Sequence, residues 1–230
     1  MDALVDQKTE FERDGAAFAV EKMLYVRGLV RGVIHEIAAA VKPGMVEEDA
    51  VEMAKDLLAA KEMLRGWHDV YVRFGTNTLK TFGADSDPGI ILGEDDIFLI
   101  DIGPVWKEWE GDGGDTFTTG ANPAMKQCAE DAKKLFHIVR KKWAGTGLNG
   151  KELYEFAEAE ALGMGWELNL DLSGHRLSEF PHAAIYDGPL AEVDFKPSPL
   201  LWVLEIHIRN HEKTFGAFYE DMLLDDSYFA

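Results

Sequence analysis

Apolar residues recur at steps of three and four in four stretches of the chain, and this spacing predicts amphipathic helices. The first predicted helix, residues 16–41, ends at Pro43-Gly44. The second, residues 46–60, has acidic residues in its first turn, where they suit the positive end of a helix dipole. The same pattern predicts helices over residues 123–143 and 151–162.

Strand-like segments rich in β-branched and aromatic residues follow each helix pair. They are residues 69–74, 97–105 and 109–119 after the first pair, and 166–171, 200–208 and 216–224 after the second. Corresponding elements lie about 100 to 110 residues apart, so the pattern predicts two pseudo-symmetric αα-βββ halves. The predicted fold class is α+β, a curved antiparallel sheet with helices on one face.

The two halves are predicted to span about residues 16–120 and 123–225. No linker rich in Pro, Gly or Ser separates the two halves, so a single compact domain, residues 1–230, is expected. A hydrophobic content of 47% is enough for a substantial core. A net charge of −19 argues against nucleic-acid binding through phosphates and against docking on anionic membranes.

The first 14 residues lack the features of a signal peptide, and no run of 18 apolar residues occurs, so a cytoplasmic protein without a membrane contact is predicted. Three chemistry-bearing residues are interpreted as structural. Cys128 lies in a predicted helix without an activating motif, and His68 follows Trp67 at a strand entrance without a partner motif. Asp115 is three residues from Asp112, so on a regular strand it faces away from it.

Acidic residues stand inside segments that otherwise predict buried strands. Residues 98–105 and 109–117 form the arms of a predicted hairpin, with a tight turn within residues 106–108. If the turn is centred between Trp106 and Lys107, the residue numbers of each cross-strand pair add up to 213. Asp101 then faces Asp112, with Cβ atoms about 5 Å apart. Two carboxylates held that close repel each other unless a proton or cation lies between them. The hairpin therefore predicts a metal.

The second half adds Glu205 and Glu220 inside its strands, and between the halves' acids lie His175 and His182, seven residues apart. Four carboxylates and one imidazole make an oxygen-rich set that suits two divalent ions such as Mn²⁺, Co²⁺, Fe²⁺ or Zn²⁺. Such ions make hydroxide available near neutral pH and polarise a carbonyl, so metal-assisted hydrolysis of an amide is predicted.

These motifs resemble a known family, the pita-bread metallopeptidases, which include methionine aminopeptidases, Xaa-Pro aminopeptidases, prolidases and creatinase. The resemblance covers nearly the whole chain, through V41-K-P-G-M-V-E-E-D49, I100-D-I-G-P104, E110-G-D-G-G-D-T-F117, G174-H-R176, L204-E-I206 and Y219-E-D221. The family's metal ligands follow the order Asp, Asp, His, Glu, Glu. In this sequence they correspond to Asp101, Asp112, His175, Glu205 and Glu220.

The resemblance implies that Asp112 and Glu220 bridge two metals, that Asp101 binds one of them, and that His175 and Glu205 bind the other. Glu205 is further implied to take a proton from the water that attacks the substrate.

Two more histidines are predicted to be catalytic. The resemblance implies that His182 donates a hydrogen bond to the substrate carbonyl or the developing oxyanion; the alternative is a group that merely orients a neighbour. His207 lies two residues beyond Glu205, so strand periodicity puts both side chains on one face. We hypothesise that His207 reaches the active-site cavity; the alternative is a hydrogen-bonded structural histidine.

Three positions depart from the family pattern. A histidine expected ahead of the first aspartate is missing, and Lys80, Thr81 or Phe82 stands in its place. Arg176 replaces a usual glycine and Ile206 replaces a usual proline. These departures bear on the substrate more than on the metals, and His207 is expected to replace part of what the missing histidine supplies.

The predicted function is that of a dinuclear metal-dependent hydrolase, an aminopeptidase or dipeptidase of Xaa-Pro type acting on small peptides. One alternative is a hydrolase of the same fold that acts on a non-peptide amide or guanidino compound. The other is a non-catalytic binding member of the family. The family's members are often oligomers, so the resemblance also suggests a homodimer.

Overall fold

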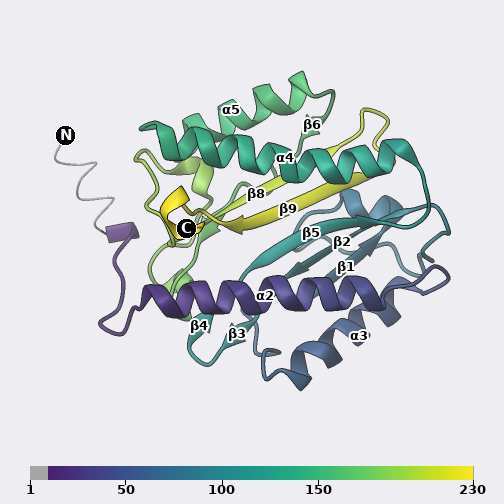
Figure 1. The fold of residues 1–230 in the computed structure, drawn as a ribbon, viewed down its shortest axis with the longest axis horizontal. Coiled ribbons are helices and arrows are strands. Elements are labelled where there is room, and N and C mark those ends of the chain that lie inside the picture. Colours follow the sequence, from purple (N-terminus) through teal and green to yellow (C-terminus); the bar gives the residue numbers. More distant parts are fainter. Residues whose placement is uncertain (1–9, 230) are drawn as a thin grey trace.

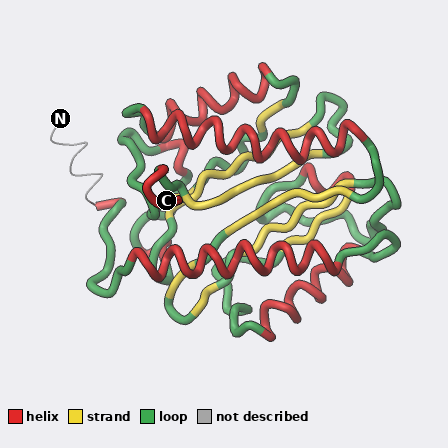
Figure 2. The backbone as a smooth tube through the Cα atoms, in the orientation of Figure 1, coloured by secondary structure: helices red, strands yellow, loops and turns green. Residues whose placement is uncertain are grey.

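The computed structural model describes residues 10–229, and its elements follow the predicted order. The helices are α2 (Val20–Ala40), α3 (Glu47–Ala60), α4 (Pro123–Gly145) and α5 (Gly150–Gly163). The strands are β1 (Tyr71–Phe74), β2 (Ile97–Ile102), β3 (Val105–Trp106), β4 (Trp109–Glu110), β5 (Gly113–Thr118), β6 (Glu167–Leu168), β7 (His175–Arg176), β8 (Trp202–Arg209) and β9 (Gly216–Met222). Figure 2 shows how the helices and strands are distributed along the backbone.

Local sequence signals determine where the helices begin. Asn122 caps α4 by accepting hydrogen bonds from two backbone N–H groups, and proline occupies the first helical position. Asn149 and Glu152 form a capping box at the start of α5. Helix α2 begins at Val20, four residues later than predicted, because residues 16 and 17 form a turn. No helix within residues 10–229 combines the length and apolarity needed to cross a membrane.

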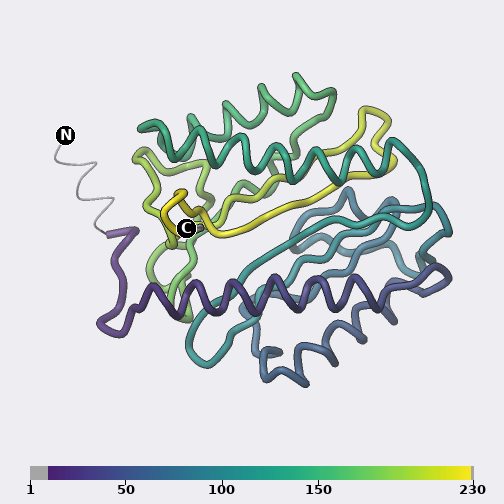
Figure 3. The backbone as a smooth tube through the Cα atoms, viewed as in Figure 1, coloured from purple at the N-terminus to yellow at the C-terminus, as the bar shows by residue number. Residues whose placement is uncertain are grey.

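The main sheet is antiparallel, with strand order β1-β2-β5-β9-β8-β6, and β7 also pairs with β8. Strands β5 and β9 join the two halves at the centre, where Gly114 pairs with Glu220. Figure 3 shows the first half of the chain, in purple to teal, beside the second half, in green to yellow. The predicted αα-βββ repeat is therefore confirmed.

Helices α2 and α4 run across the same face of the sheet (Figure 1), and α2 packs on β2 and β5 while α4 packs on β8 and β9. Ile100 belongs to the apolar core between α2 and the first-half strands. Asp101 follows it in the strand, so its carboxylate points to the opposite face. Asp115 lies on the helix side, where its Oδ2 is 2.7 Å from Nη2 of Arg31.

The hairpin register differs from the one that placed Asp101 opposite Asp112. Val105 pairs with Glu110, so partner numbers sum to 215 and Asp101 faces Gly114. A shift of two residues leaves every side chain on the same face, so the apolar pattern did not distinguish the two registers. The turn decides, because Lys107 adopts a positive φ of 57°. Asp101 and Asp112 share a face as diagonal rather than direct neighbours.

Candidate metal centre

The sheet face opposite α2 and α4 carries a cavity of about 360 Å³. This volume falls in the range of about 300 to 1,000 Å³ typical of small-molecule sites. The cavity wall includes all five predicted metal ligands and one predicted catalytic histidine: Asp101, Asp112, His175, Glu205, Glu220 and His182. Residues from both halves of the chain therefore meet around one space.

Asp112 lies between two imidazoles, one from each half of the chain. Its Oδ2 is 2.7 Å from Nε2 of His175, and its Oδ1 is 3.4 Å from Nε2 of His68. Burial disfavours the charged carboxylate, but hydrogen bonds and charge from the two rings outweigh it and hold the pKa of Asp112 below its ordinary value. Asp112 is thus the anionic centre of the cavity.

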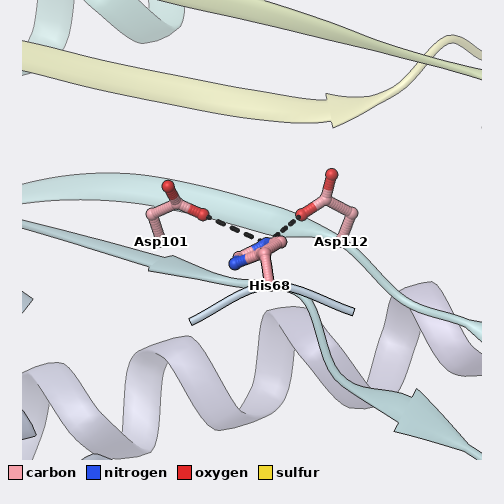
Figure 4. A group of neighbouring side chains, drawn as sticks. All are labelled: His68, Asp101 and Asp112. Carbon is pink, nitrogen blue, oxygen red and sulfur yellow. Dashed lines mark hydrogen bonds and ion pairs between the residues drawn. The ribbon is translucent and has the colours of Figure 1, made fainter. Parts of the chain in front are cut away.

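His68 was interpreted from the sequence as structural, yet it lies in this cavity. Figure 4 shows its ring between Asp101 and Asp112, and its Nε2 is 3.6 Å from Oδ1 of Asp101. Burial lowers the pKa of His68, but the effect of the two carboxylates is larger, and the pKa is raised to about 9. No local motif indicated that His68 lies beside these carboxylates, because Asp101 and Asp112 are more than 30 residues away along the chain.

The remaining carboxyl groups are buried together. Burial raises the pKa of Asp101, Glu205 and Glu220, and neighbouring carboxylates add to the rise for Glu220. The buried Oε1 of Glu220 has no hydrogen-bond partner. Two groups of three ligand atoms, each group within 4.8 Å, share Asp112. Oxygen and imidazole ligands in this arrangement fit divalent cations, which would satisfy the unpaired oxygen and the clustered charge.

His182 is held by a residue that the sequence analysis did not single out. Glu110 is fully buried and accepts hydrogen bonds from the backbone N–H of His182 at 2.7 Å and from its Nδ1 at 2.9 Å. It also accepts one from the backbone N–H of Ser178 at 3.1 Å. With Nδ1 engaged by Glu110, Nε2 is the ring nitrogen left for a ligand in the cavity.

His207 is not among the residues that line the main cavity. Its ring is buried, and Nε2 donates a hydrogen bond to the backbone oxygen of Thr78 at 2.7 Å. It lines a separate cavity of only about 10 Å³, which Asp101 also touches. Burial lowers its pKa to about 4. This geometry favours the structural alternative that was stated for His207.

Of the three departures from the family pattern, one faces the cavity. Phe82, one of the three residues that stand at the sequence position of the missing histidine, lines the cavity wall. The side chain of Arg176 donates instead to the backbone oxygens of Phe11 and Arg13, and it thereby holds the segment that precedes α2. Ile206 is buried in the core of the second half.

The sequence profile of metallopeptidase family M24 matches this chain over residues 21–224. No curated protein sequence matches it significantly.

Solved structures of three peptidases are similar in fold. An X-Pro aminopeptidase from Thermotoga maritima MSB8 has a TM-score of 0.71 and 17% identity, covering 96% of this chain and 61% of that one. Prolidase from Pyrococcus furiosus has a TM-score of 0.68 and 15% identity, covering 95% and 63%. Methionine aminopeptidase from Rickettsia prowazekii has a TM-score of 0.67 and 14% identity, covering 89% and 94%.

This chain therefore spans about three fifths of the first two structures and nearly all of the third. At these identities the likeness concerns the fold alone, and the predicted pita-bread fold is confirmed.

Proposed function

We propose, because this chain belongs to metallopeptidase family M24, that it is a metal-dependent aminopeptidase of Xaa-Pro type, which removes the first residue of a small peptide. The observation that carries the proposal is the convergence of five acidic and imidazole side chains from both halves on one cavity. Buried carboxylates in such number are costly unless cations or protons balance them. A metal centre explains why the strands contain them.

The five residues proposed to hold two divalent ions are Asp101, Asp112, His175, Glu205 and Glu220. Asp112 and Glu220 are proposed to lie between the two ions; Asp112 belongs to both groups of ligand atoms, and Glu220 belongs to one of them. When bound, the ions supply Lewis acidity: they polarise the scissile carbonyl and lower the pKa of water. Mn²⁺, Co²⁺, Fe²⁺ and Zn²⁺ are all compatible with this ligand set.

The chain's own residues are proposed to complete the reaction. Because Nδ1–H of His182 donates to Glu110, a second proton on Nε2 makes the ring an imidazolium that donates into the cavity. The buried Glu110 balances that charge, and Nε2–H stabilises the negative charge that develops on the substrate carbonyl oxygen. Glu205, whose pKa is raised by burial, is proposed to accept a proton from the attacking water and deliver it to the leaving amine.

The charge of the cavity supports an aminopeptidase over a dipeptidase. Asp171 and Asp187 line it in addition to the four proposed carboxylate ligands, and no lysine or arginine is among the described residues that line it. Two divalent ions would balance four of these six carboxylates. The excess negative charge attracts a protonated α-amine, whereas no lysine or arginine of this lining is available to pair with the C-terminal carboxylate of a dipeptide. We therefore propose substrates longer than a dipeptide.

The experiment is a metal and substrate survey of the purified 230-residue chain. After removal of bound metals, the protein is reloaded with Mn²⁺ or Co²⁺, the ions are counted, and X-Pro tripeptides, X-Pro dipeptides, Met-X peptides and non-peptide amides are assayed. Two ions per chain and faster cleavage of X-Pro tripeptides than of the dipeptides are expected. Less than one ion per chain would refute the hydrolase proposal and leave the non-catalytic alternative.

Full metal loading with hydrolysis of a non-peptide amide alone would favour that alternative substrate. A matched pair of variants links the metals to the site. Asp112→Asn should abolish metal binding, whereas Asp115→Asn, on the opposite face of the sheet, should retain both ions in the folded protein.

A further inference from the structure

We propose that His68 is a sixth metal ligand, which binds the ion on the Asp101 side of Asp112. This inference rests on the proposed function, since it assumes that Asp101 and Asp112 hold a metal. The sequence offered no motif for it. The geometry of the ring, its fixed orientation and the symmetry of the two imidazoles around Asp112 carry the argument.

The ligand atoms are spaced as a coordination shell requires. Nε2 of His68 is 3.4 Å from Oδ1 of Asp112 and 3.6 Å from Oδ1 of Asp101. Metal–ligand bonds of about 2.1 Å with tetrahedral angles give ligand–ligand separations of about 3.4 Å. The ligand atoms of His68, Asp101 and Asp112 all lie within 4.8 Å of one another, so they form a group that could hold one ion. Figure 4 shows both carboxylates turned toward the ring.

The ring is held so that only Nε2 faces this point. Nδ1 donates to the backbone oxygen of Asp69 at 2.5 Å, which leaves the lone pair of the neutral imidazole on Nε2. Gly103 provides the space for the ring, because a Cβ atom there would lie 2.1 Å from its Cδ2. The Trp67 ring stands edge-on to it, with centroids 4.4 Å apart. A backbone hydrogen bond that orients a ligating histidine is a common outer-shell device in metal sites.

With His68 as a ligand, one imidazole lies on each side of Asp112. His175 contacts Oδ2 of Asp112 and also donates from Nδ1 to the carbonyl of its following residue, Arg176, at 2.7 Å. Each oxygen of Asp112 thus faces one imidazole with the same local hydrogen bond. Four carboxylates and two imidazoles form a more nitrogen-rich set than the five predicted ligands. Such a set favours Zn²⁺, Co²⁺ or Fe²⁺ over Mn²⁺.

The test compares Co²⁺ binding by the wild-type protein with binding by His68→Gln, measured by calorimetry after metal removal. The wild type should bind two ions. The variant should bind one Co²⁺ ion with the wild-type affinity and the other at least about tenfold more weakly. His182→Gln is the matched control, because it removes an imidazole from the same cavity that is not a proposed ligand, and both affinities should remain. Wild-type affinities for both ions in His68→Gln would overturn the inference.

Proton NMR of the Co²⁺-loaded wild type gives a readout that needs no variant. An imidazole bound through Nε2 has its Nδ1–H strongly shifted by the paramagnetic ion, and this proton exchanges slowly when it is hydrogen-bonded. Two such exchangeable signals are expected, from His68 and His175, and a single one would overturn the inference even if His68→Gln fails to fold. A wild type that binds no metal would instead refute the proposed function itself.

Discussion

Replacing Glu110 by glutamine tests how the cavity uses His182. The Glu110 carboxylate is fully buried and accepts three hydrogen bonds, two from His182 and one from Ser178. Glutamine has the same shape but only one acceptor oxygen. In either orientation of the amide, its NH₂ group faces at least one of these N–H donors. The variant therefore keeps the packing and changes the charge and the hydrogen bonds.

The size of both effects follows from these contacts. One buried donor left without an acceptor should lower the free energy of unfolding by about 1 to 3 kcal/mol. The hydrogen bond between a carboxylate and a charged imidazole contributes about 1.5 to 3 kcal/mol. If His182 donates to the substrate as an imidazolium, loss of its counter-charge in Glu110→Gln should reduce kcat/KM by about 10- to 150-fold. Metal content should not change.

The assays are urea unfolding, metal counting and kinetics on the best substrate of the survey. Glu108→Gln is the matched control, because this neighbouring side chain is 72% exposed and pairs with the exposed Arg65. It should change the free energy of unfolding by no more than about 0.5 kcal/mol. A kcat/KM of Glu110→Gln within threefold of wild type, in a folded protein, would refute the reasoning about His182.

Three further predictions concern the metals, a buried histidine and the free thiol. Asp112→Asn should lose both metals and Asp101→Asn should release one preferentially, so equal and full occupancy by mass spectrometry in both variants would contradict the assignment. Burial holds the pKa of His207 at about 4, so the unfolded chain, with a pKa near 6.5, binds the extra proton between these values and stability falls as pH decreases through this window. In denaturant titrations of the metal-free protein, His207→Gln should reduce this pH-dependent loss of unfolding free energy by up to about 3 kcal/mol. Identical pH profiles of stability for variant and wild type would contradict this prediction. Burial raises the pKa of Cys128 to about 12, so a thiol reagent at pH 8 should react only with unfolded protein, and rapid reaction of the native chain would contradict this.

The helices and the order of the strands could be predicted from the sequence because each depends on periodicity and capping within a short window. The five candidate ligands could be found because acids inside apolar strands conflict with burial, whatever the exact pairing. The hairpin register could not be found in this way. Registers that differ by two residues bury the same faces, and the conformation of Lys107 in the turn distinguishes them.

Glu110 and His68 escaped prediction for a different reason. Glu110 lies at the end of a short strand, and its partner His182 is 72 residues away. Neither residue has a neighbour in sequence that reveals the contact. The position of His68 depends on Gly103, whose missing side chain leaves room for the ring. A small residue that makes space for another side chain leaves no periodic signal in the sequence.

His207 and His68 show what periodicity determines and what it does not. Alternation along β8 assigns His207 and Glu205 to one face, but a face extends over many side chains, and His207 is held by the Thr78 carbonyl beside a different, much smaller cavity. His68 is outside the regular strands, so alternation does not apply to it, yet its Nε2 lies beside Asp101 and Asp112. The segment before β1 therefore places the imidazole of His68 near these two carboxylates. Phe82, at the sequence position of the missing histidine, lines the wall of the same cavity. Because Nε2 of His68 lies beside two proposed metal ligands, Asp101 and Asp112, loss of this ring should weaken metal binding more strongly than substrate binding.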